Sequence, residues 1–213
     1  YWFIKIIEFL IVLSLVKKML KILKEKIILT ALLISGLSEL FLSLIQLINK
    51  HSIQGVFYYF GERLLSLSTP GVAKASIQGI EFLRPYGTFS HPNSLAGFFL
   101  LLYFYVLTYK KFNRYLVLKY LFLFISSVLV FISFSKIAII SYLILNTGYY
   151  ILNTKFTCRF CKIARILIIF AVSLIFLSAA TDPLTISKRI ELIKDSFMII
   201  SRYPIIGTGL GAY

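Results

Sequence analysis

The sequence predicts an all-α fold, a polytopic bundle of transmembrane helices, and three observations carry this prediction. Of the 213 residues, 59% are hydrophobic, whereas a typical soluble domain has roughly 45–50%. Mean hydropathy is +0.89, and long apolar runs alternate with short stretches that hold most of the positive charge. Such a composition excludes a disordered chain, a collagen-like fibre and a disulfide scaffold, and so much apolar surface needs lipid to cover it.

We expect six membrane segments in one membrane domain, 1–213, because a helix needs about 20 mostly apolar residues to cross a bilayer. The segments lie near 1–16, 27–49, 94–109, 116–134, 137–153 and 166–180, with a tight turn at 133–136. Two more polar regions, 50–93 and 181–213, are expected on the outer side, and 56–67 is expected as a helix in the membrane interface. The chain begins at Tyr1 and stops at Tyr213 in a predicted loop, so we expect a fragment.

The net charge of +15, from 23 Lys+Arg and 8 Asp+Glu, is concentrated in three clusters. Residues 17–26 hold five Lys and one Glu, and 110–119 and 155–165 hold four cations each, which is +4 per cluster. Short loops rich in Lys and Arg are cytoplasmic in membrane proteins. We therefore expect contact with membrane lipid and no nucleic acid partner. Cys158 and Cys161 lie in the third cluster and are interpreted as incidental thiols.

A polar stripe runs along the predicted segment 27–49. Ser35, Glu39, Ser43 and Gln46 follow each other at helical spacing, so they share one face. Polar side chains on such a face avoid lipid. The stripe is either a face that contacts substrate or protons, or a seam of hydrogen bonds between helices.

The densest group of chemically capable residues is the stretch RPYGTFSHPNSLAG at 84–97, which leads into a predicted membrane helix. Asn93 or Ser94 is expected to cap this helix, with Pro92 stiffening its start. A helix N-terminus carries free N–H groups and partial positive charge, which suits an anion such as phosphate, and Arg84 adds a planar fork. The alternative is a well-capped loop in which His91 makes one hydrogen bond.

Three stretches together resemble the O-antigen ligase and polymerase family of bacterial envelope glycan enzymes. GTFSHPNSLAG at 87–97 is similar to that family's G-T-F-x-H-P-N-x-x-A signature, and SFSK at 133–136 resembles its S-x-S-R element. The segment 189–213 resembles its R-x-x-L…P-L-x-G-x-G-x-G-x-F stretch. Lys136 stands where the family has arginine, and lysine lacks the planar fork that holds a phosphate at two points. The family's essential histidine would lie beyond Tyr213.

The resemblance implies a membrane glycosyltransferase. It would transfer a glycan from a polyprenyl-diphosphate carrier to an acceptor sugar hydroxyl, on another glycan or on a lipid, at the outer face of the bacterial cytoplasmic membrane. The implied substrate-binding residues are Arg84, His91, Asn93, Lys136 and Arg189, and the catalytic base is not among them. Cationic side chains would stabilise the charge that develops on the diphosphate leaving group. No Asp, Glu or His cluster has metal-ligand spacing, so we expect neither a metal nor another cofactor.

Two other function classes remain open. A transporter or flippase of lipid-linked sugars would use Glu39 within the membrane, although transporters usually have helices broken at the midplane and paired repeats. A structural membrane subunit would explain the topology but not three motifs in order. The glycine-rich stretch at 207–211 is G-x-G-x-G and lacks the spacing of a dinucleotide fingerprint, so it is interpreted as a turn.

Overall fold

The computed structural model describes residues 2–77, 79–152, 159–177 and 184–203. The fold is mostly helical, with 75% of the described residues in helices, which confirms the predicted helical class. The helices are α1 (Trp2–Ile22), α2 (Glu25–Asn49), α3 (Val56–Tyr59), α4 (Pro92–Thr108), the 3-10 helix η1 (Lys110–Tyr115), α5 (Leu116–Ile132), α6 (Lys136–Leu152), α7 (Arg159–Leu177) and α8 (Leu184–Arg202).

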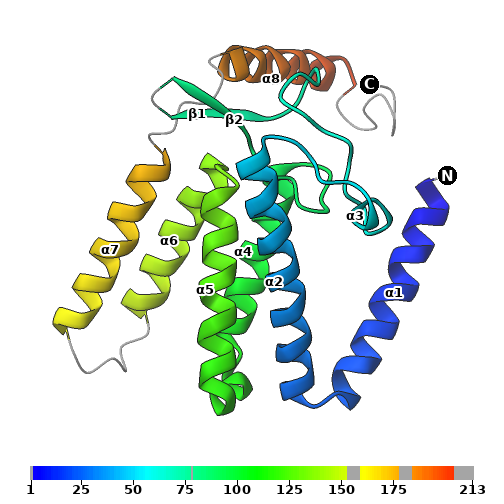
Figure 1. The fold of residues 1–213 in the computed structure, drawn as a ribbon. Coiled ribbons are helices and arrows are strands. Elements are labelled where there is room, and N and C mark those ends of the chain that lie inside the picture. Colours follow the sequence, from blue (N-terminus) through cyan, green and yellow to red (C-terminus); the bar gives the residue numbers. More distant parts are fainter. Residues whose placement is uncertain (1, 78, 153–158, 178–183, 204–213) are drawn as a thin grey trace.

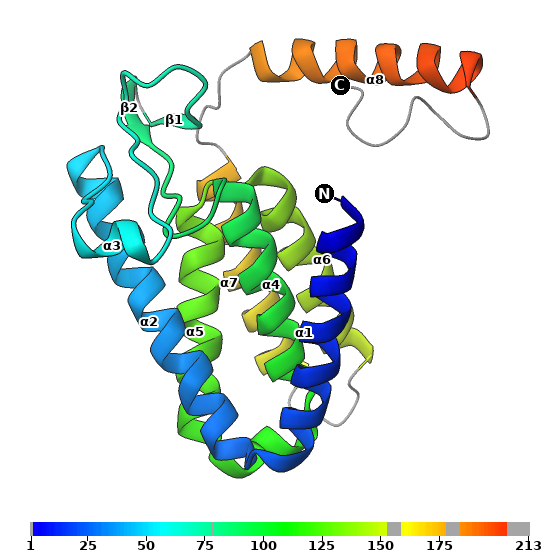
Figure 2. The same ribbon diagram turned by 90° about the vertical axis from the view of Figure 1, so that its right-hand side faces the viewer.

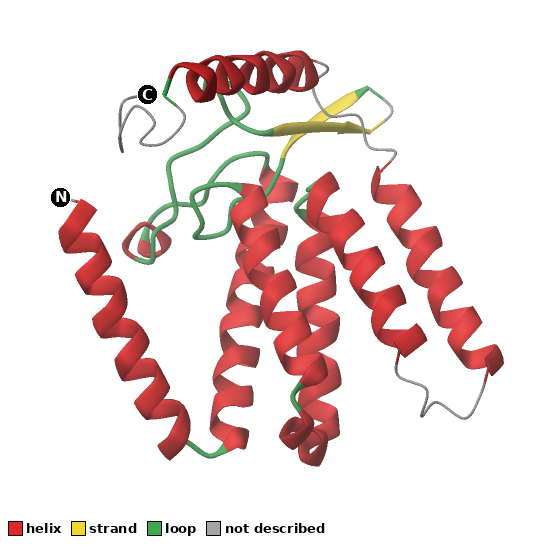
Figure 3. Cartoon of the chain, turned by 180° about the vertical axis from the view of Figure 1, so that it is seen from behind, coloured by secondary structure: helices red, strands yellow, loops and turns green. Residues whose placement is uncertain are grey.

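A short antiparallel hairpin contains the only two strands among the described residues (Figure 3). Strand β1 (Lys74–Ile77) pairs with β2 (Ile80–Leu83), with Lys74 opposite Leu83 and Ile77 opposite Ile80. These strands are not predictable from the sequence, because four residues per strand are too few for a clear alternating pattern.

The long helices lie along a common direction, which gives the molecule two distinct ends (Figure 1). We call the end that carries β1 and β2 the hairpin end. The turn from α1 to α2, the helix η1 and the start of α7 lie at the opposite end, which we call the basic end because the clusters at 17–26 and 110–119 belong to it. Helix α8 runs crosswise to the bundle at the hairpin end (Figure 2).

Two of the described helices, Glu25–Asn49 and the continuous stretch Lys110–Ile132, are long and apolar enough to cross a membrane. Pro92–Thr108 and Ile166–Leu177 are apolar but shorter. The outward surface of these helices is strongly apolar, since Leu101, Val117 and Phe124 are 75%, 80% and 65% exposed. Soluble proteins rarely leave so much contiguous apolar surface uncovered. The structure thus supports two of the six expected spans by length and composition.

The core is formed where α2, α4, α5 and α6 meet, around fully buried side chains such as Phe99, Phe122 and Ile139. Gly36 allows α2 to approach α5 closely, because a Cβ there would lie 3.2 Å from Cγ2 of Ile125. Small residues at such crossings are typical of membrane helices.

Two expectations about local structure are wrong. The interfacial helix expected at 56–67 is only the four-residue α3, and Glu62 in this region is buried. Lys119, counted among the loop cations, is also buried, and its Nζ donates to the Leu107 carbonyl at 2.9 Å and to Asn113 Oδ1 at 2.7 Å. This lysine satisfies a carbonyl near the end of α4, where helices leave acceptors without partners.

Candidate functional site

The candidate site lies at the hairpin end, where the chain turns through residues 84–91 before it enters α4. Gly87 adopts φ 58°, a left-handed conformation that glycine reaches without steric cost. A Cβ at this position would collide with Oε2 of Glu39 on α2. The turn therefore requires glycine for its backbone conformation and for its close approach to α2.

The polar stripe of α2 holds this turn through side-chain hydrogen bonds. Gln46 Oε1 accepts from the N–H groups of Tyr86 at 3.0 Å and Gly87 at 2.8 Å, and its Nε2 donates to the Gly87 carbonyl at 3.2 Å. Glu39 accepts from the Thr88 N–H at 3.2 Å and from the Thr88 hydroxyl. Glu39 and Gln46 thus form a hydrogen-bonding seam whose partners are loop backbone and Thr88 rather than another helix. The buried hydroxyl of Ser43 has no hydrogen-bond partner among the described residues.

Glu62 extends the same seam to the loop after α2. Its Oε1 accepts from Gln46 Nε2 at 2.8 Å and from the Ile53 N–H at 2.8 Å, while Oε2 accepts from the Gln54 N–H at 2.6 Å. Because three hydrogen-bond donors surround this buried carboxylate, it interacts with groups of the protein and not with a ligand.

Arg84 joins three separate segments. Its Nε donates to the Ser133 carbonyl at 2.9 Å and its Nη2 donates to Asn93 Oδ1 at 2.8 Å. The guanidinium is buried, with a residue exposure of 9%. The structure therefore brings Arg84 and Asn93 together with the α5–α6 turn. In this arrangement the fork of Arg84 positions protein groups.

His91 caps α4, which corrects the expectation that Asn93 or Ser94 has this role. Its Nδ1 accepts from the Asn93 N–H at 3.1 Å, and Pro92 occupies the first turn. Proline is favoured there because its missing N–H would have no partner in any case. Since Nδ1 accepts, the proton of a neutral imidazole lies on Nε2.

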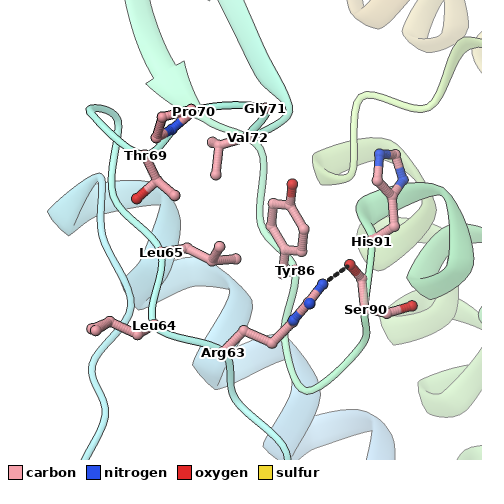
Figure 4. A pocket seen from close by; sticks show the side chains of 10 residues that line it. All are labelled: Arg63, Leu64, Leu65, Thr69, Pro70, Gly71, Val72, Tyr86, Ser90 and His91. Atoms are coloured by element: carbon pink, nitrogen blue, oxygen red, sulfur yellow. Dashed lines mark hydrogen bonds between the residues drawn. The ribbon is translucent and has the colours of Figure 1, made fainter.

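A pocket of about 390 Å³ lies next to His91, between the 63–72 loop and the stretch 86–91 (Figure 4). This volume is at the lower end for small-ligand sites. Its lining residues are Arg63, Leu64, Leu65, Thr69, Pro70, Gly71, Val72, Tyr86, Ser90 and His91. Arg63 Nη1 donates to the Ser90 carbonyl at 3.1 Å, which ties the two walls together.

Arg63 brings a positive charge to the pocket, and no ion pair among the described residues neutralises it. The neighbouring Glu62 is turned into the interior. Arg63 was not among the predicted site residues. Its position beside a buried acid, in a loop that reaches the H-P-N stretch, could not be recognised without the fold.

Lys136 and Arg189, the other two predicted substrate-binding residues, are not part of this hydrogen-bonded group. Lys136 is the first residue of α6 and is exposed, directly after Phe134 with φ 52° and the buried Ser135. Arg189 belongs to α8, but its side chain lies outside the described residues, as does the whole glycine-rich stretch at 207–211. Of the five, Arg84, His91 and Asn93 are thus brought together, and Lys136 follows the turn that Arg84 holds.

No family model, no curated protein and no solved structure matches the chain.

Proposed function

We propose that the chain is a membrane glycosyltransferase of the O-antigen ligase or polymerase type. It transfers a glycan from a polyprenyl-diphosphate carrier to an acceptor sugar hydroxyl at the outer face of the bacterial cytoplasmic membrane. In this proposal all six predicted segments lie in the membrane, and the basic end faces the cytoplasm.

The observation that carries the proposal is the cationic pocket built from the H-P-N stretch at the hairpin end. Arg63 lines it from the 63–72 loop and His91 lines it from the start of α4. The hydrogen-bonded turn at 84–91 keeps these two segments in position. The anionic headgroup of the glycan carrier would meet hydrogen-bond donors of the protein that are already in position. A preorganised site of this kind stabilises developing negative charge without reorganisation. The segments that line the pocket belong to the hairpin end, opposite to the basic clusters at 17–26 and 110–119, as transfer at the outer face requires.

The residues divide into two roles under this proposal. Arg63 and His91 contact the donor in the pocket, while Arg84 and Asn93 are positioning residues. Arg84 holds the carbonyl of Ser133, and the same turn leads to Lys136, which supplies a further cation for the diphosphate. Arg189 keeps its proposed role toward the diphosphate or its flanking sugar.

Transport is the less favoured class. Glu39 is the residue that favours a transporter, and its carboxylate accepts hydrogen bonds from Thr88. A flippase would need this group to exchange partners during every cycle.

The test uses the full-length gene in cells that lack the chromosomal copy, with analysis of lipid-linked and transferred glycans. We expect Arg63→Gln to lower transfer at least about 10-fold, because removal of one donor to a developing oxyanion typically costs more than that. Arg114→Gln, an exposed arginine at the basic end, is the matched control and should leave transfer unchanged.

The face of the membrane at which lipid-linked glycan accumulates distinguishes a transferase from a flippase. Loss of a transferase leaves single glycan units on the carrier at the outer face, whereas loss of a flippase traps them inside. Arg84→Ala and Arg189→Ala should both abolish transfer while the protein is still made. Normal transfer by the Arg63, Arg84 and Arg189 variants would contradict the proposal.

A further inference from the structure

Helix α8 carries an exposed apolar stripe. Ile190, Ile193, Phe197 and Ile200 are spaced three, four and three residues apart, so they lie along one side of the helix. Their exposures are 51%, 55%, 68% and 58%. Glu191, Asp195 and Arg202 lie on the opposite side. The helix is therefore amphipathic, and none of the described residues covers its apolar side.

Helix α8 is unsuited to crossing a bilayer. It contains Lys188, Arg189, Glu191, Lys194, Asp195 and Arg202 within 19 residues. A charged side chain at the centre of a membrane helix costs several kcal/mol. Helices with a strong apolar side, a charged side and low overall hydrophobicity instead lie in the plane of the membrane surface.

The position of α8 fits that placement. It runs crosswise to the bundle at the hairpin end (Figure 2). Helix α7 ends at Leu177 and α8 begins at Leu184, and the six residues between them reach about 20 Å at most. The outward side chains of α7, such as Leu167, Ile168 and Leu174, are 60%, 64% and 51% exposed. The start of α8 is thus within reach of the level at which an apolar, lipid-facing helix ends.

The charge of α8 favours an anionic partner over a neutral one, and anionic lipid headgroups meet this requirement. Four cations and two acids between Leu184 and Arg202 give +4 − 2 = +2. Basic amphipathic helices bind anionic lipid headgroups through this charge, at about 1 kcal/mol per cation near the surface.

We propose that α8 lies in the plane of the membrane surface at the hairpin end, with Ile190, Ile193, Phe197 and Ile200 inserted at the boundary between headgroups and acyl chains. This inference rests on the membrane placement in the proposed function, but not on glycan transfer.

The test is depth-dependent fluorescence quenching of the full chain in liposomes of phosphatidylcholine and phosphatidylglycerol. The sequence has one tryptophan, Trp2, so Trp2→Phe provides a silent background. Phe197→Trp places a reporter on the apolar stripe, and Asp195→Trp is the matched control on the opposite side of the same helix. Phe124→Trp, on the exposed side of α5, reports whether the bundle itself is embedded.

We expect phospholipids brominated near the headgroup to quench Phe197→Trp at least about threefold more strongly than Asp195→Trp, and aqueous acrylamide to show the reverse order. Equal quenching of the two positions would overturn the inference. So would a Phe197→Trp signal shielded from both lipid and acrylamide, because protein would then cover the stripe. If Phe124→Trp is quenched by deep bromines while Phe197→Trp is not, the membrane placement stands and only the α8 inference fails.

Discussion

The turn at 84–91 and the β1–β2 hairpin precede α4 at the same end of the molecule, yet they are held in different ways. The turn is fastened to α2 by buried side chains, above all Gln46 and Glu39. The hairpin has its own strand pairing and one exposed ion pair, Lys74–Glu81 at 3.7 Å. Buried hydrogen bonds are costly to break and exposed ion pairs contribute little. The turn is thus fixed mainly by buried hydrogen bonds to α2, whereas the hairpin is fixed by its strand pairing and by apolar packing of Ala75 and Phe82 on Phe134.

The largest effect is expected from Gln46→Leu. The substitution removes the acceptor of the Tyr86 and Gly87 N–H groups and the donor to Glu62. Each buried polar group left without a partner costs about 1–3 kcal/mol, so we expect a loss of roughly 3–5 kcal/mol. Thermal unfolding of the purified protein in detergent measures it. Ser35→Ala, at the exposed end of the same stripe, should leave the melting temperature unchanged. A melting temperature of Gln46→Leu equal to that of the parent would show that the seam does not hold the turn.

Gly87→Ala should cause the second largest loss of stability. Comparison with Gly79→Ala in the hairpin tests the difference between the two regions. Gly79 in the hairpin has φ 82° with no atom within 4 Å of a built Cβ, whereas a Cβ on Gly87 meets Glu39. The left-handed conformation costs about 1–2 kcal/mol for a non-glycine residue, and the collision with the seam adds about 1–3 kcal/mol. We therefore expect Gly79→Ala to show the first cost alone and Gly87→Ala to show both, in the same unfolding measurement. Equal losses for the two variants would mean that Glu39 moves aside freely.

The smallest effect is expected from Lys74→Ala. This substitution breaks the ion pair with Glu81, whose two side chains are 39% and 65% exposed. Exposed pairs contribute about 0–1 kcal/mol, so stability should change by less than about 0.5 kcal/mol and glycan transfer should stay at the parent level. A loss of transfer in Lys74→Ala with unchanged stability would show that the hairpin takes part in the site.

Hydropathy located most helices well because these helices are apolar over most of their length. The segments expected at 94–109 and 116–134 are observed as α4 and α5 with ends shifted by at most two residues. The shift at the start of α4 has a local cause, since His91 rather than Asn93 supplies the cap. Helix α8 was expected only as part of an outer region, because its charges lower its mean hydropathy to that of a loop.

The site was harder to predict. The spacing of Glu39 and Gln46 showed that α2 has a polar side, but not that its partners are residues 86–88, some forty positions later. Arg84 was predicted to hold a diphosphate, and the fold instead engages its fork with Ser133 and Asn93. Arg63 lines the pocket and escaped prediction because the sequence placed it within the interfacial helix expected at 56–67.

The sequence by itself determined the helical class of the chain and the separation of basic clusters from apolar runs, because both depend on local composition and spacing. Only the tertiary structure decided which charges are used internally and which face the pocket. Glu62, Arg84 and Lys119 are occupied by partners in the protein, while Arg63 lines the pocket and forms no ion pair with any described carboxylate. The reason is physical: the availability of a charge depends on the donors, acceptors and solvent around it, and those come from segments far apart in the chain.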